Sequence, residues 1–163
     1  MIQTLTKTEQ IVEAAKVLRE ANRTIANDFG ITAENAPSNP AFISAERLEK
    51  QIKEGLALFA YIKDKRIVGV IGIEDSGRDE TVCYIERLAV LPQERHNGIG
   101  EKLMTYCESV IRQRRRNKAG IAIIEENIRL KKWYKKLGNT EKGTKKFDHL
   151  PFTVGFLEKE IKS

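Results

Sequence analysis

Residues 81–100 read TVCYIERLAVLPQERHNGIG, an apolar-rich run followed by a proline and then by two glycines. The run through residue 90 predicts a β-strand, and Pro92 ends it because proline has no backbone N–H to donate to a ladder. From Gly98 onward, apolar residues recur at the three- and four-residue steps of a helix that reaches residue 116. The sequence therefore predicts a strand, a glycine-bearing loop and a long helix in succession.

The loop between this strand and this helix, RHNGIG at residues 95–100, is suited to binding an anion. Free backbone N–H groups and the helix dipole attract negative charge to a helix N-terminus. Gly98 and Gly100 let a pyrophosphate approach the backbone, and they tolerate unusual dihedral angles. The loop is neither a P-loop nor a dinucleotide-binding G-x-G-x-x-G motif. Taken alone, it is equally consistent with glycines that serve only close packing at a helix start.

The N-terminal part of the chain is predicted to be helical on either side of one irregular segment. Apolar residues follow a helical period over residues 6–30, behind a capping-box pattern of Thr6 and Glu9, and a shorter helix is predicted over residues 44–55. Residues 32–43 are rich in proline and asparagine. They predict an irregular connection that is long enough to carry function.

Strand-like runs account for most of the remaining chain. Residues 56–63 and 66–73 precede the strand quoted above, and the three runs together predict an antiparallel meander. Beyond the long helix, the pattern predicts a strand over residues 121–124 and a helix over residues 130–137. Residues 140–161 alternate well enough to predict two closing strands.

The composition is typical of one globular domain spanning residues 1–163. Hydrophobic residues make up 40% of the chain and charged residues 32%, a balance that supports a packed core. No apolar run reaches the roughly 20 residues of a membrane span and the N-terminus lacks signal-peptide features, so we expect a cytoplasmic protein without membrane contact. Cys83 and Cys107 are too few for a disulfide scaffold and lack zinc-ligand spacing, so we expect reduced core thiols and no metal.

The net charge of +6 raises the question of a nucleic-acid partner, because clustered lysines and arginines release counterions from phosphate backbones. Here the basic residues are spread over helix faces, at residues 112–116 and 131–136, without a basic tail or a recognition helix. The distribution favours a solvated basic face and argues against nucleic acid as a partner. The same field would also attract a trianionic cofactor.

A second motif lies downstream in NIRLKKWYKKLG, where Asn127 is followed seven residues later by Tyr134. With IERLAVLP at residues 85–92 and the loop at residues 95–100, this pattern resembles the GNAT superfamily of acyl-CoA N-acyltransferases. The match covers about residues 81–138. The resemblance implies an α/β (α+β) fold with a mixed, mostly antiparallel central sheet, splayed between its fourth and fifth strands and flanked by helices on both faces.

The same resemblance implies acetyl-CoA as the acetyl donor. In the family's arrangement, backbone groups of the fourth strand hold the acetyl carbonyl and the pantetheine arm, the loop amides hold the pyrophosphate, and the asparagine contacts the cofactor near the thioester. The residues implied in acetyl-CoA binding are Leu88, Ala89, Val90, Arg95, His96, Asn97, Gly98, Ile99, Gly100, Glu101 and Asn127.

Catalysis is expected to involve Tyr134 and Glu86. A tyrosine hydroxyl with a pKa near 10 stays protonated at neutral pH and can give its proton to the departing CoA thiolate, although Tyr134 also fits a purely core position on the apolar helix face. Glu86 lies on the strand beside the thioester site and can accept the proton of the amine. It can equally be a solvated strand residue or the ion-pair partner of Arg87. Glu125 and Glu126 fit better as helix N-terminal charges than as bases.

Three further residues bear on the acceptor pocket of the family. His149 lies between the two closing strands, where both contact with the acceptor and a structural turn stay open as roles. The chain departs from the family's pattern at Asn139, where phenylalanine is common, and at Leu130, where a small residue is common. Both departures lie outside the cofactor loop, so they leave acetyl-CoA binding intact and alter only the wall of the acceptor pocket.

We therefore expect an N-acetyltransferase that moves the acetyl group of acetyl-CoA to a primary amine by direct attack in a ternary complex. Neither cysteine stands where an acetylated nucleophile is expected. The acceptor is either a small-molecule amine or a protein amine, and residues 32–43 are expected to help select it. Two alternatives from other classes are a non-catalytic acyl-CoA sensor and a basic RNA-associated module. The sequence leaves a homodimer open.

Overall fold

The computed structural model describes all residues from 1 to 163 and builds them around one sheet. The strands are β1 (Ile2–Thr4), β2 (Ala57–Lys63), β3 (Arg66–Asp75), β4 (Val82–Val90), β5 (Lys118–Ile124), β6 (Thr140–Lys146) and β7 (Thr153–Glu160). The helices are α1 (Thr8–Asp28), α2 (Ala45–Lys53), α3 (Ile99–Gln113) and α4 (Ile128–Lys136), with 3₁₀ turns at Pro40–Phe42 and Pro92–Glu94. The strand order is β1-β2-β3-β4-β5-β7-β6. The mixed α/β class is therefore confirmed.

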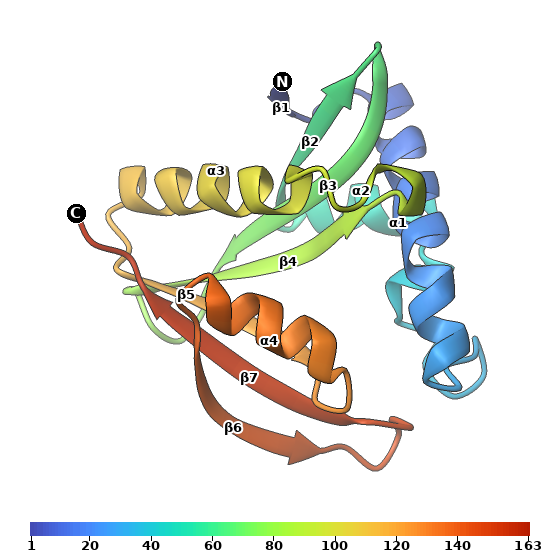
Figure 1. The fold of residues 1–163 in the computed structure, drawn as a ribbon. Coiled ribbons are helices and arrows are strands. Elements are labelled where there is room, and N and C mark those ends of the chain that lie inside the picture. Colours follow the sequence, from blue (N-terminus) through green and yellow to red (C-terminus); the bar gives the residue numbers. More distant parts are fainter.

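Helices cover both faces of the sheet. Successive side chains of a strand point to opposite faces, yet every residue of β3 from Ile67 through Ile73 is buried, so both faces of that strand must be covered. On one face α3 packs through Tyr106, whose ring meets that of Phe59 edge-on at 5.1 Å between centroids. Figure 1 shows α3 in front of β2 and β3, and α1 with α2 behind them.

The sheet is splayed between β4 and β5. These two strands pair in parallel only through Val82 with Lys118, Cys83 with Ala119 and Tyr84 with Gly120. Beyond this point β4 continues without a partner on that side, while β5 pairs antiparallel with β7 along its whole length. The expected splayed, mostly antiparallel sheet is confirmed, and the separation leaves an open backbone edge on β4.

Two local expectations are corrected by the structure. The first helix begins at Thr8, and the side-chain oxygen of Gln10 accepts hydrogen bonds from the backbone N–H groups of Thr6 and Lys7, so Glu9 takes no part in the cap. Strand β5 begins at Lys118, three residues before the expected start, because Gly120 is a packing glycine: a Cβ there would lie 2.9 Å from the Tyr84 ring. Glycine at this position therefore continues the strand instead of breaking it.

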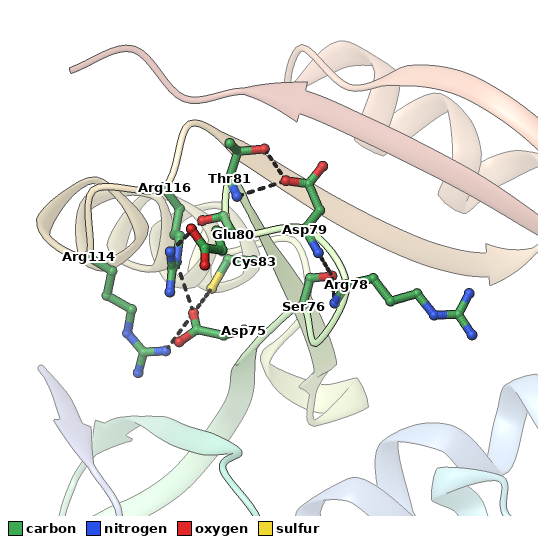
Figure 2. Close-up of polar contacts among 9 residues, drawn as sticks. All are labelled: Asp75, Ser76, Arg78, Asp79, Glu80, Thr81, Cys83, Arg114 and Arg116. Atoms are coloured by element: carbon green, nitrogen blue, oxygen red, sulfur yellow. Dashed lines mark hydrogen bonds and ion pairs between the residues drawn. The ribbon is translucent and has the colours of Figure 1, made fainter.

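A polar cluster fastens the β3–β4 turn to the end of α3 (Figure 2). The carboxylate of Asp75 accepts from the Cys83 thiol at 3.2 Å and from Arg114 at 3.3 Å, and it forms an ion pair with Arg116 at 3.6 Å. Burial and the Asp75 carboxylate raise the pKa of the Cys83 thiol to about 12. Cys83 and Cys107 are both buried and free, which agrees with two reduced core thiols. None of the helices has the length and apolar composition needed to cross a membrane.

Candidate active site

A cavity of about 410 Å³ opens where β4 and β5 separate. One wall is formed by β4 residues 85–88 and another by β5 residues 121–124, so the cavity begins where the pairing of the two strands ends. Residues 36–40, from the irregular segment between α1 and α2, form a third wall, and α4 with the β6–β7 connection closes the remainder. The splay of the sheet therefore creates the cavity.

The cavity gathers several side chains that lie far apart in the sequence. Of the residues predicted for the site, Glu86, Leu88, Asn127 and Tyr134 line it, and so does His149. The loop residues from Arg95 to Glu101 do not line this cavity. They lie at the start of α3, which follows β4 directly through the 3₁₀ turn.

Tyr134 belongs to the hydrophobic core and also lines the cavity. Its side chain is 5% exposed, and its ring meets that of Trp133 edge-on at 5.0 Å between centroids. The hydroxyl has no hydrogen-bond partner within the protein, and burial raises the pKa of Tyr134 above its ordinary value. The Tyr134 hydroxyl is therefore protonated at neutral pH.

Glu86 is half-buried in the β4 wall. Burial raises the pKa of its carboxyl, and the negative charge of Glu74 raises it further. The ion pair with Arg87 considered above does not form, although the positive charge of Arg87 acts in the opposite direction on the Glu86 pKa. A carboxylate with a raised pKa is a better proton acceptor near neutral pH than an ordinary glutamate.

Arg87 sits at a β-bulge that the sequence pattern does not reveal. The register of β3 with β4 shifts between Val70 and Gly72, and Arg87 adopts the left-handed conformation with φ 60°. Its guanidinium donates to the side-chain oxygen of Gln51 at 3.1 Å, while its buried Nε has no partner. The one available signal in the sequence is the charged pair Glu86 and Arg87 inside an apolar-rich strand run.

The loop before α3 presents a row of unpaired backbone donors. The first helical hydrogen bond at this end runs from Lys102 N–H to the Gly98 carbonyl, and the N–H groups from His96 through Glu101 donate to no protein acceptor. His96 and Gly98 both have positive φ, at 67° and 78°. Alternation into the left-handed region turns successive N–H groups toward one side of a loop, which is the geometry of anion-binding nests.

The Arg95 side chain anchors this loop to the rest of the fold. Its guanidinium donates to the carbonyl of Val90 at 3.2 Å and to that of Ala21, on α1, at 2.8 Å. Both hydrogen bonds use the Arg95 guanidinium as a donor to carbonyl groups of the protein itself. The groups of this loop that are free to bind an anion are therefore its backbone N–H groups and not the Arg95 guanidinium.

The residues around the start of α4 have structural partners. The side-chain oxygen of Asn127 caps α4 by accepting from Leu130 N–H at 3.2 Å, while its amide nitrogen remains without a protein partner. Glu125 forms an ion pair with Lys131, and Glu126 accepts from the backbone N–H of Thr153 at 2.9 Å. Neither glutamate lines the cavity, which agrees with structural charges rather than bases.

The two departures from the family's pattern have clear positions. Asn139 is buried, and its side-chain amide donates to the Tyr134 carbonyl at 2.9 Å, which satisfies the end of α4. Leu130 lines the cavity, where its bulk narrows the space beside Tyr134. No group of three or more histidines, cysteines or acidic residues is gathered as a metal site.

Sequence comparison identifies the family. A family model described as the acetyltransferase (GNAT) domain matches residues 26–153, which include the loop before α3 and all of α4. The chain belongs to the GNAT acetyltransferase family. Among curated protein sequences, none shows a significant match to this GNAT domain.

Solved structures share the fold of this GNAT domain. The ribosomal-protein-S18-alanine N-acetyltransferase from Escherichia coli has a TM-score of 0.77 at 13% identity, covering 100% of this chain and 94% of that one. An acetyltransferase of the GNAT family from Streptococcus pneumoniae has a TM-score of 0.72 at 12% identity, covering 99% of both chains. An aminoglycoside 6'-N-acetyltransferase complexed with coenzyme A has a TM-score of 0.70 at 17% identity, covering 100% and 98%. At these identities the likeness establishes the fold.

Proposed function

We propose that this GNAT domain transfers the acetyl group of acetyl-CoA to an amine, by direct attack of the amine within a ternary complex. The observation that carries the proposal is the row of unpaired N–H groups from His96 through Glu101, which follows the open edge of β4 in the chain, while residues 85–88 of the same strand line the cavity. A pyrophosphate is the kind of anion that such a row and a helix N-terminus bind. The aminoglycoside acetyltransferase with the same fold is complexed with coenzyme A, which supports this assignment.

The pyrophosphate and the pantetheine arm of acetyl-CoA would bind to different parts of the chain. The amides before α3 would hold the pyrophosphate. The unpartnered edge of β4, at Leu88, Ala89 and Val90, would receive the pantetheine arm in the way that a peptide adds to a sheet edge. Acetyl-CoA supplies the activated acyl group as a thioester, and its reacting end would lie in the cavity near Asn127.

Two side chains of the cavity have the chemistry that transfer requires. The attacking amine has to be neutral, so Glu86 would accept its proton, directly or through a water molecule. As the C–N bond forms and the C–S bond breaks, the Tyr134 hydroxyl would give its proton to the sulfur, because a thiol leaves more easily than a thiolate in an apolar cavity. The position of Tyr134 in the cavity lining and the absence of a protein hydrogen-bond partner for its hydroxyl support this role.

A thiol-release assay with acetyl-CoA and a panel of amines and peptides tests the proposal. We expect free CoA thiol to appear at a rate that depends on the amine, at sub-stoichiometric protein. A sensor would bind acetyl-CoA and release no thiol with any amine. An RNA-associated module would bind nucleic acid in a salt-dependent way and show no affinity for CoA. Either of these results would overturn the transferase assignment.

A further inference from the structure

Two arginines without acidic partners lie beside the cavity. Arg87 lines it from the β4 bulge, with a single hydrogen bond to the neutral amide of Gln51 and a buried Nε that lacks a partner. Arg47, in the first turn of α2, donates to the carbonyl of Pro37 at 3.3 Å, and Pro37 itself lines the cavity. Neither arginine takes part in an ion pair, so we call Arg47 and Arg87 the arginine pair.

Such an arrangement costs stability in the absence of a ligand. Burial lowers the pKa of Arg87, and the positive charge of Arg47 lowers it further, against the opposing influence of Glu86 and Glu74. Buried charges in proteins are ordinarily paired and hydrogen-bonded, because removing them from water is expensive. An anionic group in the cavity would supply the missing partner for Arg87.

The bulge also bears on how the carboxylate of Glu86 and the guanidinium of Arg87 are placed at the cavity. In a regular strand, neighbouring residues point to opposite faces, so Glu86 and Arg87 would be separated by the sheet. The extra residue at the bulge interrupts this alternation, and Glu86 and Arg87 both belong to the stretch of β4, residues 85–88, that lines the cavity. The left-handed conformation of Arg87 is unfavourable for a non-glycine residue, which is often a sign that a side chain is held for function.

We propose that the acceptor is a small aminocarboxylate, an amine that carries a carboxylate, and that Arg87 binds this carboxylate while Glu86 faces the amine. The inference rests on the proposed function and narrows its substrate class. A guanidinium fork matches a planar carboxylate with two hydrogen bonds. A polycationic amine is disfavoured, because the arginine pair would repel its additional positive charges. Because the cavity wall carries one negative side chain, Glu86, and one positive side chain, Arg87, a zwitterion is the complementary ligand.

The test compares matched acceptors on the wild-type protein. The acceptors are amino acids with small, aliphatic or aromatic side chains. For each of them, thiol release is measured with the free amino acid, with its carboxamide, and with the corresponding amine that lacks the carboxyl group. We expect kcat/KM to be about ten- to a hundredfold higher for the acid than for its amide, which is the range for a hydrogen bond to a charged group. Amides or simple amines that react as fast as the acids would overturn the inference and leave the transferase assignment standing.

Substitution of the arginine provides the second arm of the test. In Arg87→Gln, which removes the charge but keeps an amide near the same position, the ratio of acid to amide in kcat/KM should fall toward one. The matched control is Arg114→Gln, which removes a charge at the C-terminal end of α3, outside the cavity lining, and should keep the wild-type ratio. An unchanged ratio in Arg87→Gln, with the protein folded by its thermal transition, would exclude Arg87 as the carboxylate contact.

The two proposals fail in different ways. If neither the acids, amides and simple amines nor the peptides release thiol while acetyl-CoA binds, the transferase assignment falls and the aminocarboxylate inference falls with it. If thiol release occurs but is fastest with amines that carry no carboxylate, only the inference falls. If Arg87→Gln does not fold, the wild-type comparison of acid, amide and amine still decides, because it requires no substitution.

Discussion

Gly98 and Gly100 stand two residues apart and serve different physical needs. Gly98 precedes α3 with φ 78°, and a Cβ at this position would meet no atom within 4 Å. Gly100 has an ordinary φ, but its Cβ would lie 3.3 Å from the Trp133 ring. The first glycine therefore provides a backbone conformation and the second a close approach of α3 to α4. Only Gly98 shapes the row of free amides directly.

Gly98→Val should weaken coenzyme A binding, and Gly98→Asn should weaken it much less. A β-branched residue in the left-handed region costs on the order of 1–2 kcal/mol or more, whereas asparagine visits that region readily. The strain would be relieved by turning the amides away from their present direction. Calorimetric titration with CoA and urea unfolding of both variants measure the two effects. Equal CoA affinity in the Val and Asn variants would show that the loop conformation does not matter for binding.

Tyr134→Phe separates the catalytic role of this residue from its core role. The substitution keeps the ring that packs against Trp133 and removes only the hydroxyl, which has no protein partner. General acid catalysis is typically worth about 10² to 10⁴ in rate, so kcat should fall by that order while acetyl-CoA affinity and the melting temperature stay near wild type. Turnover, affinity and melting temperature are measured on the same variant. Full turnover with a good acceptor would remove Tyr134 from the mechanism.

At the scale of elements, α3 is fastened at both ends. Arg95 ties the loop before it to α1, and the Asp75 cluster ties its C-terminal end to the β3–β4 turn. Burial works against ionisation of Asp75, but its contacts with Cys83, Arg116 and Arg114 outweigh burial and hold the pKa of its carboxyl below the ordinary value. The cluster therefore stabilises the fold only while Asp75 is ionised.

Asp75→Asn should lower the stability of the protein at neutral pH and change its acid response. A carboxyl whose pKa is depressed in the folded state contributes stability above its unfolded pKa, near 4, and loses that contribution as the pH falls through the folded value. The difference in melting temperature between wild type and variant should thus be largest near pH 6 and shrink below pH 4. Asp148→Asn, which removes an exposed carboxyl without an ion pair, is the control. A difference that does not depend on pH would contradict this account.

A helix or strand can be predicted from the sequence when the residues that cause it to form lie close together in the chain. The β2–β3–β4 meander, the loop and α3 follow from periodicity, proline and glycine, which act within a few residues. Strand β1 has only three residues and exists because it pairs with β2, and Gly120 continues β5 because Tyr84 packs on it. Contacts between residues that lie far apart in the chain produce no periodic pattern of apolar residues, so the sequence does not predict them.

The same rule holds for the residues of the site: those in local motifs were predictable, and those placed by contacts between distant segments were not. The family's motifs predicted that Glu86, Leu88, Asn127 and Tyr134 belong to one site, and they line one cavity. The bulge at Arg87 and the anchoring of Arg95 to α1 were not predictable, because both depend on register and on the packing of distant segments.

At the scale of the whole molecule, coenzyme A should stabilise the fold by mass action. A ligand that binds only the folded state adds about 2.7 kcal/mol at a concentration a hundredfold above its dissociation constant. The melting temperature should therefore rise with CoA concentration in a saturable binding series measured by differential scanning fluorimetry. Heparin, at matched charge concentration, tests the generic alternative for a protein of net charge +6. Equal stabilisation by heparin would indicate a nonspecific basic surface rather than a CoA site.

The molecule has two halves that meet at the short parallel pairing of β4 with β5. One contains β1–β4 with α1–α3, and the other contains β5–β7 with α4; their backbones are joined across the sheet by three residue pairs at one end. The two halves share one hydrophobic core, in which Ile71 and Leu103 of the first half cluster with Tyr134 of the second, so the gap between β4 and β5 is confined to one end of the sheet. A molecule bound in the cavity would contact β4 and β5 at the end where these strands are unpaired, and so would connect the two halves where the backbone does not.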